Sequence, residues 1–141
     1  MKLQFSISEL SSYLDEVFPQ VVNRYRIVDL QQGYARVIQN ITQENLRPGG
    51  TVSGPTIFSL VDIGMYILLL AQIGKEPPAV TTNCSTDFLK KPTMDEELFA
   101  DCNLLKLGKT LVVGEVLVKS SDQEDLVARS SITYYRPKAQ T

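Results

Sequence analysis

One carboxylate, Asp62, lies inside a segment from Pro55 to Ile73 that is otherwise uncharged and mostly apolar. If this segment forms a helix, apolar residues cover every side of it, which is typical of a helix buried in a protein core. Burying an ionised carboxylate without hydrogen-bond partners carries a large free-energy cost. We therefore expect Asp62 either to be held by donors for structural reasons or to act as a nucleophile or general base, and its apolar surroundings favour the catalytic role.

The chain contains no histidine. It therefore lacks the Ser-His-Asp and Cys-His arrangements of many hydrolases and the histidine ligands of the usual zinc sites. Acid–base chemistry would have to come from carboxylates, Lys, Tyr, Cys or bound water. The two cysteines, Cys84 and Cys102, are too few for a disulfide framework, and we expect both to be reduced thiols in the core.

Length and charge narrow the class of protein further. The 141 residues suit a single domain spanning 1–141, and the net charge of -2 argues against nucleic-acid binding. Residues Met1–Leu10 lack the apolar core of a signal peptide, so we expect a cytoplasmic protein. The Pro55–Ile73 segment approaches the length of a membrane span, but polar residues interrupt it, and a core helix is favoured over a span.

A first helix is predicted over about residues 6–18, where apolar residues recur at helical spacing. Ser6 and Glu9 form a capping-box pattern at its start, and Pro19 ends it. Two strands joined by a tight turn are predicted next, at Tyr25–Leu30 and Tyr34–Gln39.

The central helix is predicted over about residues 55–73. Ser53 or Gly54 can cap its first turn, and Pro55 suits the first helical position because its missing N–H has no intrahelical partner there. Gly74 follows the last apolar residue and ends the helix.

From residue 80 onward the apolar residues recur with a period of two. Four strands are predicted, at Val80–Leu89, Glu97–Leu107, Thr110–Lys119 and Leu126–Tyr135. A flat antiparallel sheet cannot bury a helix that is apolar on all sides, so the sheet must curl around it. The sequence therefore predicts the α+β hotdog fold, a curled antiparallel sheet wrapped around a long central helix.

Two motifs resemble those of a known family. The run Ser53-Gly-Pro-Thr-Ile-Phe-Ser-Leu-Val-Asp62 resembles the central-helix signature of phenylacetic-acid-degradation-type (PaaI-like) acyl-CoA thioesterases, in which a His-Gly-Gly turn precedes a helix and a catalytic Asp follows nine residues after the His. The run Lys106-Leu-Gly-Lys-Thr-Leu111 resembles the turn before that family's penultimate strand. The resemblance covers roughly residues 22–135 and implies hydrolysis of a small or medium acyl-CoA to free acid and CoA, with no metal or prosthetic group.

The resemblance also implies roles for individual residues. Asp62 would be the nucleophile or general base, the Gly54 backbone N–H the oxyanion donor, and Thr82 the residue that positions the water. Ser53 completes the implied catalytic set, and the implied substrate-binding residues are Arg47, Asn83, Gly108, Lys109 and Thr110. The last three would hold the phosphates or the pantetheine arm of CoA.

The chain departs from the family pattern at three positions. Ser53 replaces the motif His, Pro55 replaces the second Gly, and Arg47 stands where relatives often carry an Asn. Ser53 can still cap the helix, whereas Pro55 removes one N–H that would otherwise face the substrate. Arg47 adds a fixed positive charge near the pocket, which suits an acidic acyl group or a phosphate.

Partners and alternatives follow from the same resemblance. Such sites lie at a dimer interface, with Asp62 of one subunit facing Thr82 of the other, so we expect a homodimer or a dimer of dimers. The missing motif His also motivates an alternative, a non-catalytic hotdog protein that binds acyl-CoA or another small ligand. Hydration or dehydration of an acyl thioester is disfavoured, because relatives with that activity pair a carboxylate with a His.

Overall fold

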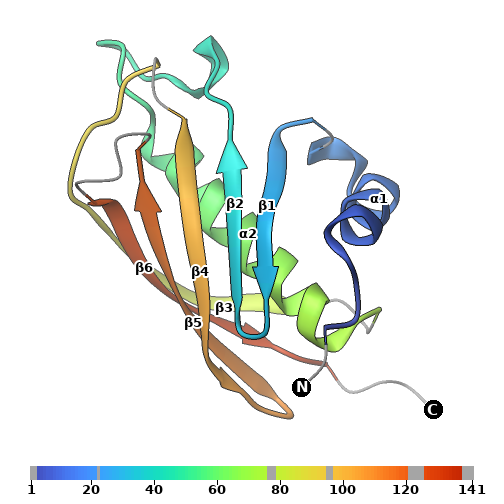
Figure 1. Cartoon of the computed structure of the whole chain (residues 1–141). Helices are drawn as coiled ribbons and strands as arrows, with labels where there is room; N and C mark the ends of the chain where they lie inside the picture. Colours follow the sequence, from blue (N-terminus) through green and yellow to red (C-terminus); the bar gives the residue numbers. More distant parts are fainter. Residues whose placement is uncertain (1–2, 22, 76–78, 95–96, 121–125, 138–141) are drawn as a thin grey trace.

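The computed structural model describes residues 3–21, 23–75, 79–94, 97–120 and 126–137 (Figure 1). Along the chain its elements are α1 (Ile7–Val17), the 3-10 turn η1 (Pro19–Val21), β1 (Tyr25–Gln31), β2 (Tyr34–Gln39), the 3-10 turn η2 (Gln43–Asn45), α2 (Gly54–Ile73), β3 (Val80–Phe88), β4 (Leu98–Leu107), β5 (Leu111–Lys119) and β6 (Leu126–Tyr135). Each predicted helix and strand is present, with ends that differ from the prediction by at most two residues.

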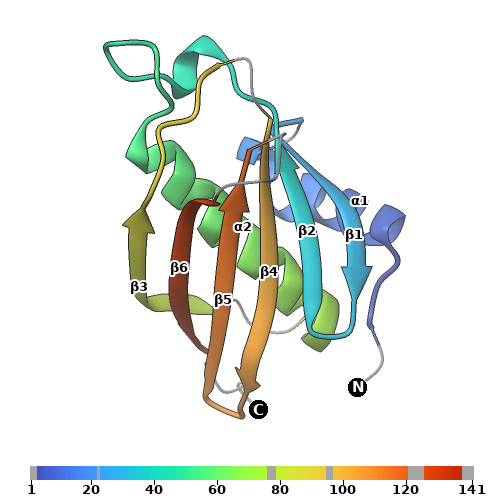
Figure 2. The same ribbon diagram turned by 60° about the vertical axis from the view of Figure 1, so that its left-hand side comes forward.

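The described residues form one six-stranded antiparallel sheet in the order β1-β2-β4-β5-β6-β3. Figures 1 and 2 show the sheet curling around α2, with β1 at one edge and β3 at the other. This arrangement confirms the hotdog fold. Strand β3 pairs with β6 and not with β4, the next strand in the chain. The chain therefore crosses from the edge of the sheet to its middle between β3 and β4.

Helix α2 has the predicted caps. The Ser53 hydroxyl accepts a hydrogen bond from the Thr56 N–H at 3.2 Å, and Gly74 ends the helix with a φ of 78° and an N–H bonded to the Leu70 carbonyl. Within the part of the chain that the structure describes, α2 is the one helix long and apolar enough to cross a membrane. However, 72% of its most apolar 18-residue stretch is buried inside the fold. Each fully buried Leu or Ile stabilises the fold by about 2 kcal/mol.

A glycine in the middle of α2 allows the helix to approach the sheet closely. A Cβ atom on Gly64 would lie 2.8 Å from the Cys102 sulfur on β4, too close for normal packing. Cys102 is buried as predicted, whereas Cys84 on β3 is only partly buried. The side chains of Ala100 and Cys102 therefore face α2, and Asp101 between them faces the outer side of the sheet.

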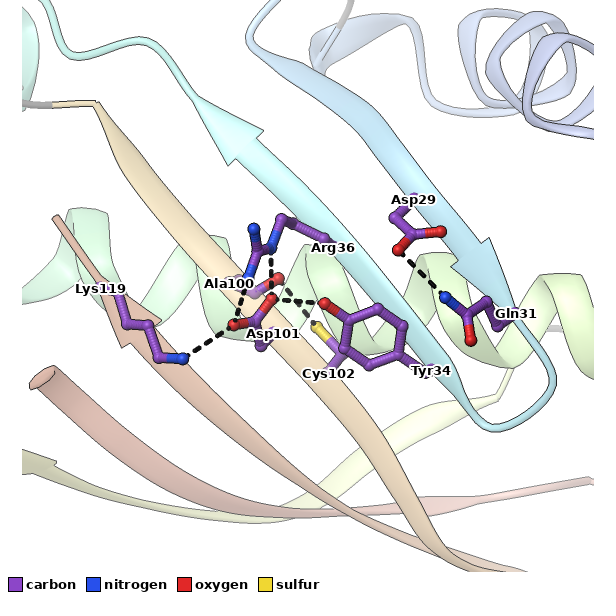
Figure 3. Close-up of polar contacts among 8 residues, drawn as sticks. All are labelled: Asp29, Gln31, Tyr34, Arg36, Ala100, Asp101, Cys102 and Lys119. Atoms are coloured by element: carbon purple, nitrogen blue, oxygen red, sulfur yellow. Dashed lines mark hydrogen bonds and ion pairs between the residues drawn. The ribbon is translucent and has the colours of Figure 1, made fainter. Parts of the chain in front are cut away.

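Asp101 is the centre of a charged cluster on that outer face (Figure 3). It is 5% exposed, and its two oxygens accept hydrogen bonds from Arg36 at 2.6 and 3.0 Å and from the Tyr34 hydroxyl at 2.8 Å. The Lys119 ammonium lies 3.2 Å from the second oxygen. Burial alone would raise the pKa of Asp101, but the donors from Arg36, Tyr34 and Lys119 outweigh burial and hold this pKa below its ordinary value.

Replacing Asp101 is expected to weaken the fold in a pH-dependent way. Because the folded-state pKa is lowered, the ionised carboxylate stabilises the protein at neutral pH, and this contribution is lost as the pH falls below about 4. Asp101→Asn should lower the free energy of unfolding by about 3 kcal/mol at pH 7, because it leaves Arg36 and Lys119 without their counter-ion. The loss should not be larger, since both cations keep some contact with water. The difference between the two proteins should shrink towards pH 3. Urea unfolding of wild type and Asp101→Asn between pH 3 and pH 7 measures this difference in the free energy of unfolding.

A matched control is Glu97→Gln. Glu97 pairs with Arg26 at 3.5 Å on the surface, where the two side chains are 49% and 57% exposed. Its loss should change stability by less than about 0.5 kcal/mol. Equal losses in the two variants would contradict a special role for the Asp101 cluster.

Candidate functional site

The Asp62 side chain is half-buried and is tied to two strands. Its Oδ1 atom accepts hydrogen bonds from the Tyr134 hydroxyl of β6 and the Thr81 hydroxyl of β3, both at 2.8 Å. The Tyr134 hydroxyl also lies 2.7 Å from the Asp62 backbone oxygen. No described residue donates a hydrogen bond to the second carboxylate oxygen, Oδ2. One oxygen of Asp62 is therefore fixed by uncharged donors, and the other is left for a water molecule or a substrate.

The Asp62 side chain lines a mostly apolar cavity of about 210 Å³. Its other lining residues are Phe18, Ile63, Tyr66, Ala79, Thr81 and Tyr134; we call it the Asp62 recess. Burial, together with the neighbouring carboxylate, raises the pKa of Tyr134. The Tyr134 hydroxyl therefore stays protonated at neutral pH and remains a hydrogen-bond donor to Asp62.

A second cavity, of about 340 Å³, lies at the N-terminal end of α2. Three basic residues, Arg47, Lys90 and Lys91, line it together with Thr51 and Gly54. Four apolar side chains, those of Val52, Ile57, Phe88 and Leu89, complete its surface; we call this cavity the cationic cleft. The Gly54 N–H belongs to the first turn of α2 and has no acceptor among the described residues, as expected for a helix N-terminus.

The irregular register of β3 determines which of its threonines contacts Asp62. The pairing of β3 with β6 shifts register between Thr81 and Asn83. Thr81 binds Asp62, whereas the Thr82 hydroxyl donates to the Thr133 carbonyl at 3.3 Å. Within one subunit Thr81, and not Thr82, is beside the carboxylate, and the expected contact of Thr82 with Asp62 of a second subunit stays a prediction.

Ser53 and the turn between β4 and β5 lie apart from Asp62. The Ser53 hydroxyl is engaged in capping α2 and lies 2.8 Å from the Thr56 hydroxyl. Residues Gly108, Lys109 and Thr110 line neither the Asp62 recess nor the cationic cleft. Figure 2 shows their turn at the opposite end of the sheet from the N-terminus of α2, so a role in holding substrate at Gly54 would require a second subunit.

Two residues of the site, Tyr134 and Thr81, were not selected from the sequence. The sequence does contain a signal for Tyr134. Apolar residues alternate along the last strand, and this alternation places Tyr134 on the same face as Ile132, towards the helix. A tyrosine at such an inward position needs a hydrogen-bond partner for its hydroxyl. Asp62 is the one acidic residue of the central helix, so this pair was accessible to sequence reasoning.

The arrangement supports acid–base or nucleophilic chemistry by a carboxylate. Asp62 offers one free oxygen, and Gly54 offers a free N–H in a region that favours negative charge. Within the described residues, no group of three or more Cys, Asp or Glu side chains lies close enough together to hold a metal ion.

Comparison with known proteins gives consistent matches. Residues 49–127 match the model of the family described as the Thioesterase superfamily. The crystal structure of a candidate thioesterase from Silicibacter sp. TM1040 is 47% identical in sequence, covers 98% of this chain and 96% of that chain, and superposes with a TM-score of 0.91. A candidate esterase of Archaeoglobus fulgidus is 29% identical over 111 residues, which are 79% of this chain and 70% of that protein.

The E. coli PaaI protein, from the phenylacetic acid degradation operon, shares the fold. It is 21% identical, covers 96% of this chain and 99% of that chain, and has a TM-score of 0.81. The structure and these matches bear out the hotdog fold and the resemblance drawn from the two sequence motifs.

The Tyr134 hydroxyl is expected to stabilise the fold through Asp62. Tyr134→Phe keeps the buried ring and removes the bonds to the Asp62 carboxylate and backbone oxygen, so the free energy of unfolding should fall by about 1–3 kcal/mol. Tyr135→Phe is the matched control, because Tyr135 is the next residue of β6 and is 38% exposed. Denaturant unfolding should separate the two variants, and equal stabilities would contradict the importance of the Asp62 contact.

Proposed function

The chain belongs to the Thioesterase superfamily and is a thioester hydrolase, and from this premise we propose that it converts a small or medium acyl-CoA to the free acid and CoA. The proposal rests on Asp62, because Tyr134 and Thr81 fix one of its oxygens, the other has no partner among the described residues, and the residue lines a mostly apolar cavity. A carboxylate in these surroundings is suited to activate water or to attack a carbonyl carbon.

Two routes are compatible with this carboxylate. In the first, Asp62 accepts a proton from water while the water oxygen bonds to the thioester carbon. In the second, Asp62 itself bonds to that carbon and displaces CoA as a thiolate, and water then hydrolyses the anhydride. In both routes the carbonyl oxygen gains negative charge, and the Gly54 N–H at the start of α2 is the proposed donor that stabilises it.

The spacing of Gly54 and Asp62 favours a site shared between two subunits. Asp62 lies eight positions after Gly54 on the same helix, which corresponds to about 12 Å along the helix axis. An oxyanion donor has to lie about 3 Å from the oxygen it stabilises. We therefore propose that Gly54 of one subunit acts with Asp62 of the other in a homodimer.

Exposed apolar residues support this assembly. On the free edge of the sheet, Val80 and Phe88 of β3 are 53% and 54% exposed, and Phe58 on the same side of α2 as Asp62 is 41% exposed. An unpaired edge strand beside an apolar helix surface is suited to pair with a second copy of the chain.

Binding without catalysis is the second candidate. It is favoured by Pro55, which removes one N–H from the first turn of α2, and by Ser53, whose hydroxyl is already used as a cap. A folded protein that binds acyl-CoA but hydrolyses none of a broad panel would support this candidate and oppose the first.

Asp62→Asn is expected to abolish most turnover. The Asn side-chain oxygen can still accept hydrogen bonds from Tyr134 and Thr81, so the fold should persist, while kcat falls at least about 100-fold because the base or nucleophile is lost. CoA release from an acyl-CoA panel should be measured by chromatography, since the partly exposed Cys84 thiol would interfere with thiol reagents. The control variant Asp15→Asn changes an exposed residue of α1 and should retain full activity. Wild-type activity in Asp62→Asn would contradict the proposed role of this carboxylate.

A mixed dimer tests whether the site is shared. Gly54→Pro removes the proposed oxyanion donor at a helix start where proline is tolerated, and Ser53 before it already has the extended backbone that precedes a proline. Homodimers of Gly54→Pro or Asp62→Asn should be nearly inactive. A heterodimer of the two, purified with two tags and sized by light scattering, should regain about half of the wild-type rate, because one of its two sites is intact. An inactive heterodimer, or a monomeric wild type, would contradict the shared site.

A further inference from the structure

The cationic cleft combines positive charge with an apolar surface in one cavity. Arg47, Lys90 and Lys91 are its three basic lining residues, and none of the described residues that line it is an Asp or a Glu. Val52, Ile57 and Phe88 are among its apolar lining residues. With a volume of about 340 Å³, the cleft lies at the small end of ligand pockets, so it suits an acyl group better than a whole CoA nucleotide.

Backbone pairing joins the two separate segments that carry the basic residues of the cleft. Leu46 pairs with Val52, and Thr51 pairs with Thr93, as isolated antiparallel bridges. The Val52 N–H also donates to the Pro92 carbonyl at 2.9 Å. These bonds join the loop that carries Arg47 to the segment that carries Lys90 and Lys91, so their convergence is built into the fold.

Several cations of the sheet form ion pairs with carboxylates, whereas Arg47 and Lys91 of the cleft form none with the described residues. Arg36 and Lys119 share Asp101, and Arg129 lies near Asp87 and Glu115. Among the described residues, none forms an ion pair with Arg47 or Lys91. The cleft therefore carries an excess of positive charge at the end of α2 where the Gly54 N–H is free.

We propose that the cationic cleft recognises an acyl group that ends in a carboxylate, so that the preferred substrate is a short ω-carboxyacyl-CoA. This inference rests on the proposed thioesterase function and adds the substrate class. The Arg47 guanidinium can hold a carboxylate through two parallel hydrogen bonds, and Lys91 adds a second charge. The apolar side chains contact the methylene groups between the carboxylate and the thioester. A phosphate of CoA would use the cations but would leave this apolar surface without a partner.

The test compares glutaryl-CoA with pentanoyl-CoA, two substrates of equal chain length that differ in the terminal carboxylate. Wild type should have the higher kcat/KM for glutaryl-CoA. Arg47→Gln should lower the ratio of the two kcat/KM values at least about tenfold, the effect of losing a charge-assisted hydrogen bond. Arg26→Gln, which removes a cation of β1 outside the cleft, should leave the ratio unchanged. Assays with the corresponding acyl-pantetheines, which lack the CoA phosphates, should give the same ratios.

The outcomes separate this inference from the proposed function. Turnover of acyl-CoAs with no preference for glutaryl-CoA, or an equal loss for both substrates in Arg47→Gln, would overturn the ω-carboxyacyl assignment and leave the thioesterase intact. If the Arg47→Gln effect vanishes with acyl-pantetheines, the cleft binds a CoA phosphate and the assignment is wrong. If wild type hydrolyses no acyl-CoA in the panel, the thioesterase proposal and the substrate class fail together.

Discussion

The hydrogen bonds that hold Asp62 depend on the curl of the sheet, and the curl follows from the apolar surface of α2. Because α2 is apolar on nearly all sides, the sheet has to wrap around it, and the wrapping brings β3 next to β6 at the free edge. Thr81 and Tyr134 then approach Asp62 from two strands that lie 19 and 72 residues away in the chain. The burial of the core and the placement of the carboxylate therefore have one physical origin.

The fold stabilises two carboxylates in opposite ways. Both oxygens of Asp101 are used, by an arginine, a lysine and a tyrosine, and two cations lie within 3.2 Å of them. Asp62 receives only neutral donors, and both act on the same oxygen. A carboxylate with both oxygens bound by cations serves as a structural anchor, whereas one with an oxygen that no described residue binds can contact water or substrate. This contrast favours Asp62 over Asp101 as the reactive group.

Most of the fold could be predicted from the sequence because periodicity, caps and turns are local. The period of two from Val80 onward gave the strands, and Ser53 and Gly74 marked the ends of α2. The pairing of β3 with β6 is set by long-range packing and has no local signal. For the same reason the irregular register at Thr81 hid which threonine reaches Asp62, because a period of two cannot locate such an irregularity. The Asp101 cluster combines charges from three strands and was invisible until their order was known.

The position of α2 in the chain has a consequence for synthesis on the ribosome. The helix is complete at Ile73, but the four strands that cover most of it are made afterwards, and Tyr134 belongs to the last of these strands. Of the described helices and strands, only α1, β1 and β2 precede this helix, which is as apolar as a membrane span. A late-closing core of this kind leaves an aggregation-prone surface exposed during translation. The first half of the chain therefore depends on the second for its solubility, and an early stop codon after α2 would release a fragment that chaperones or proteases must remove.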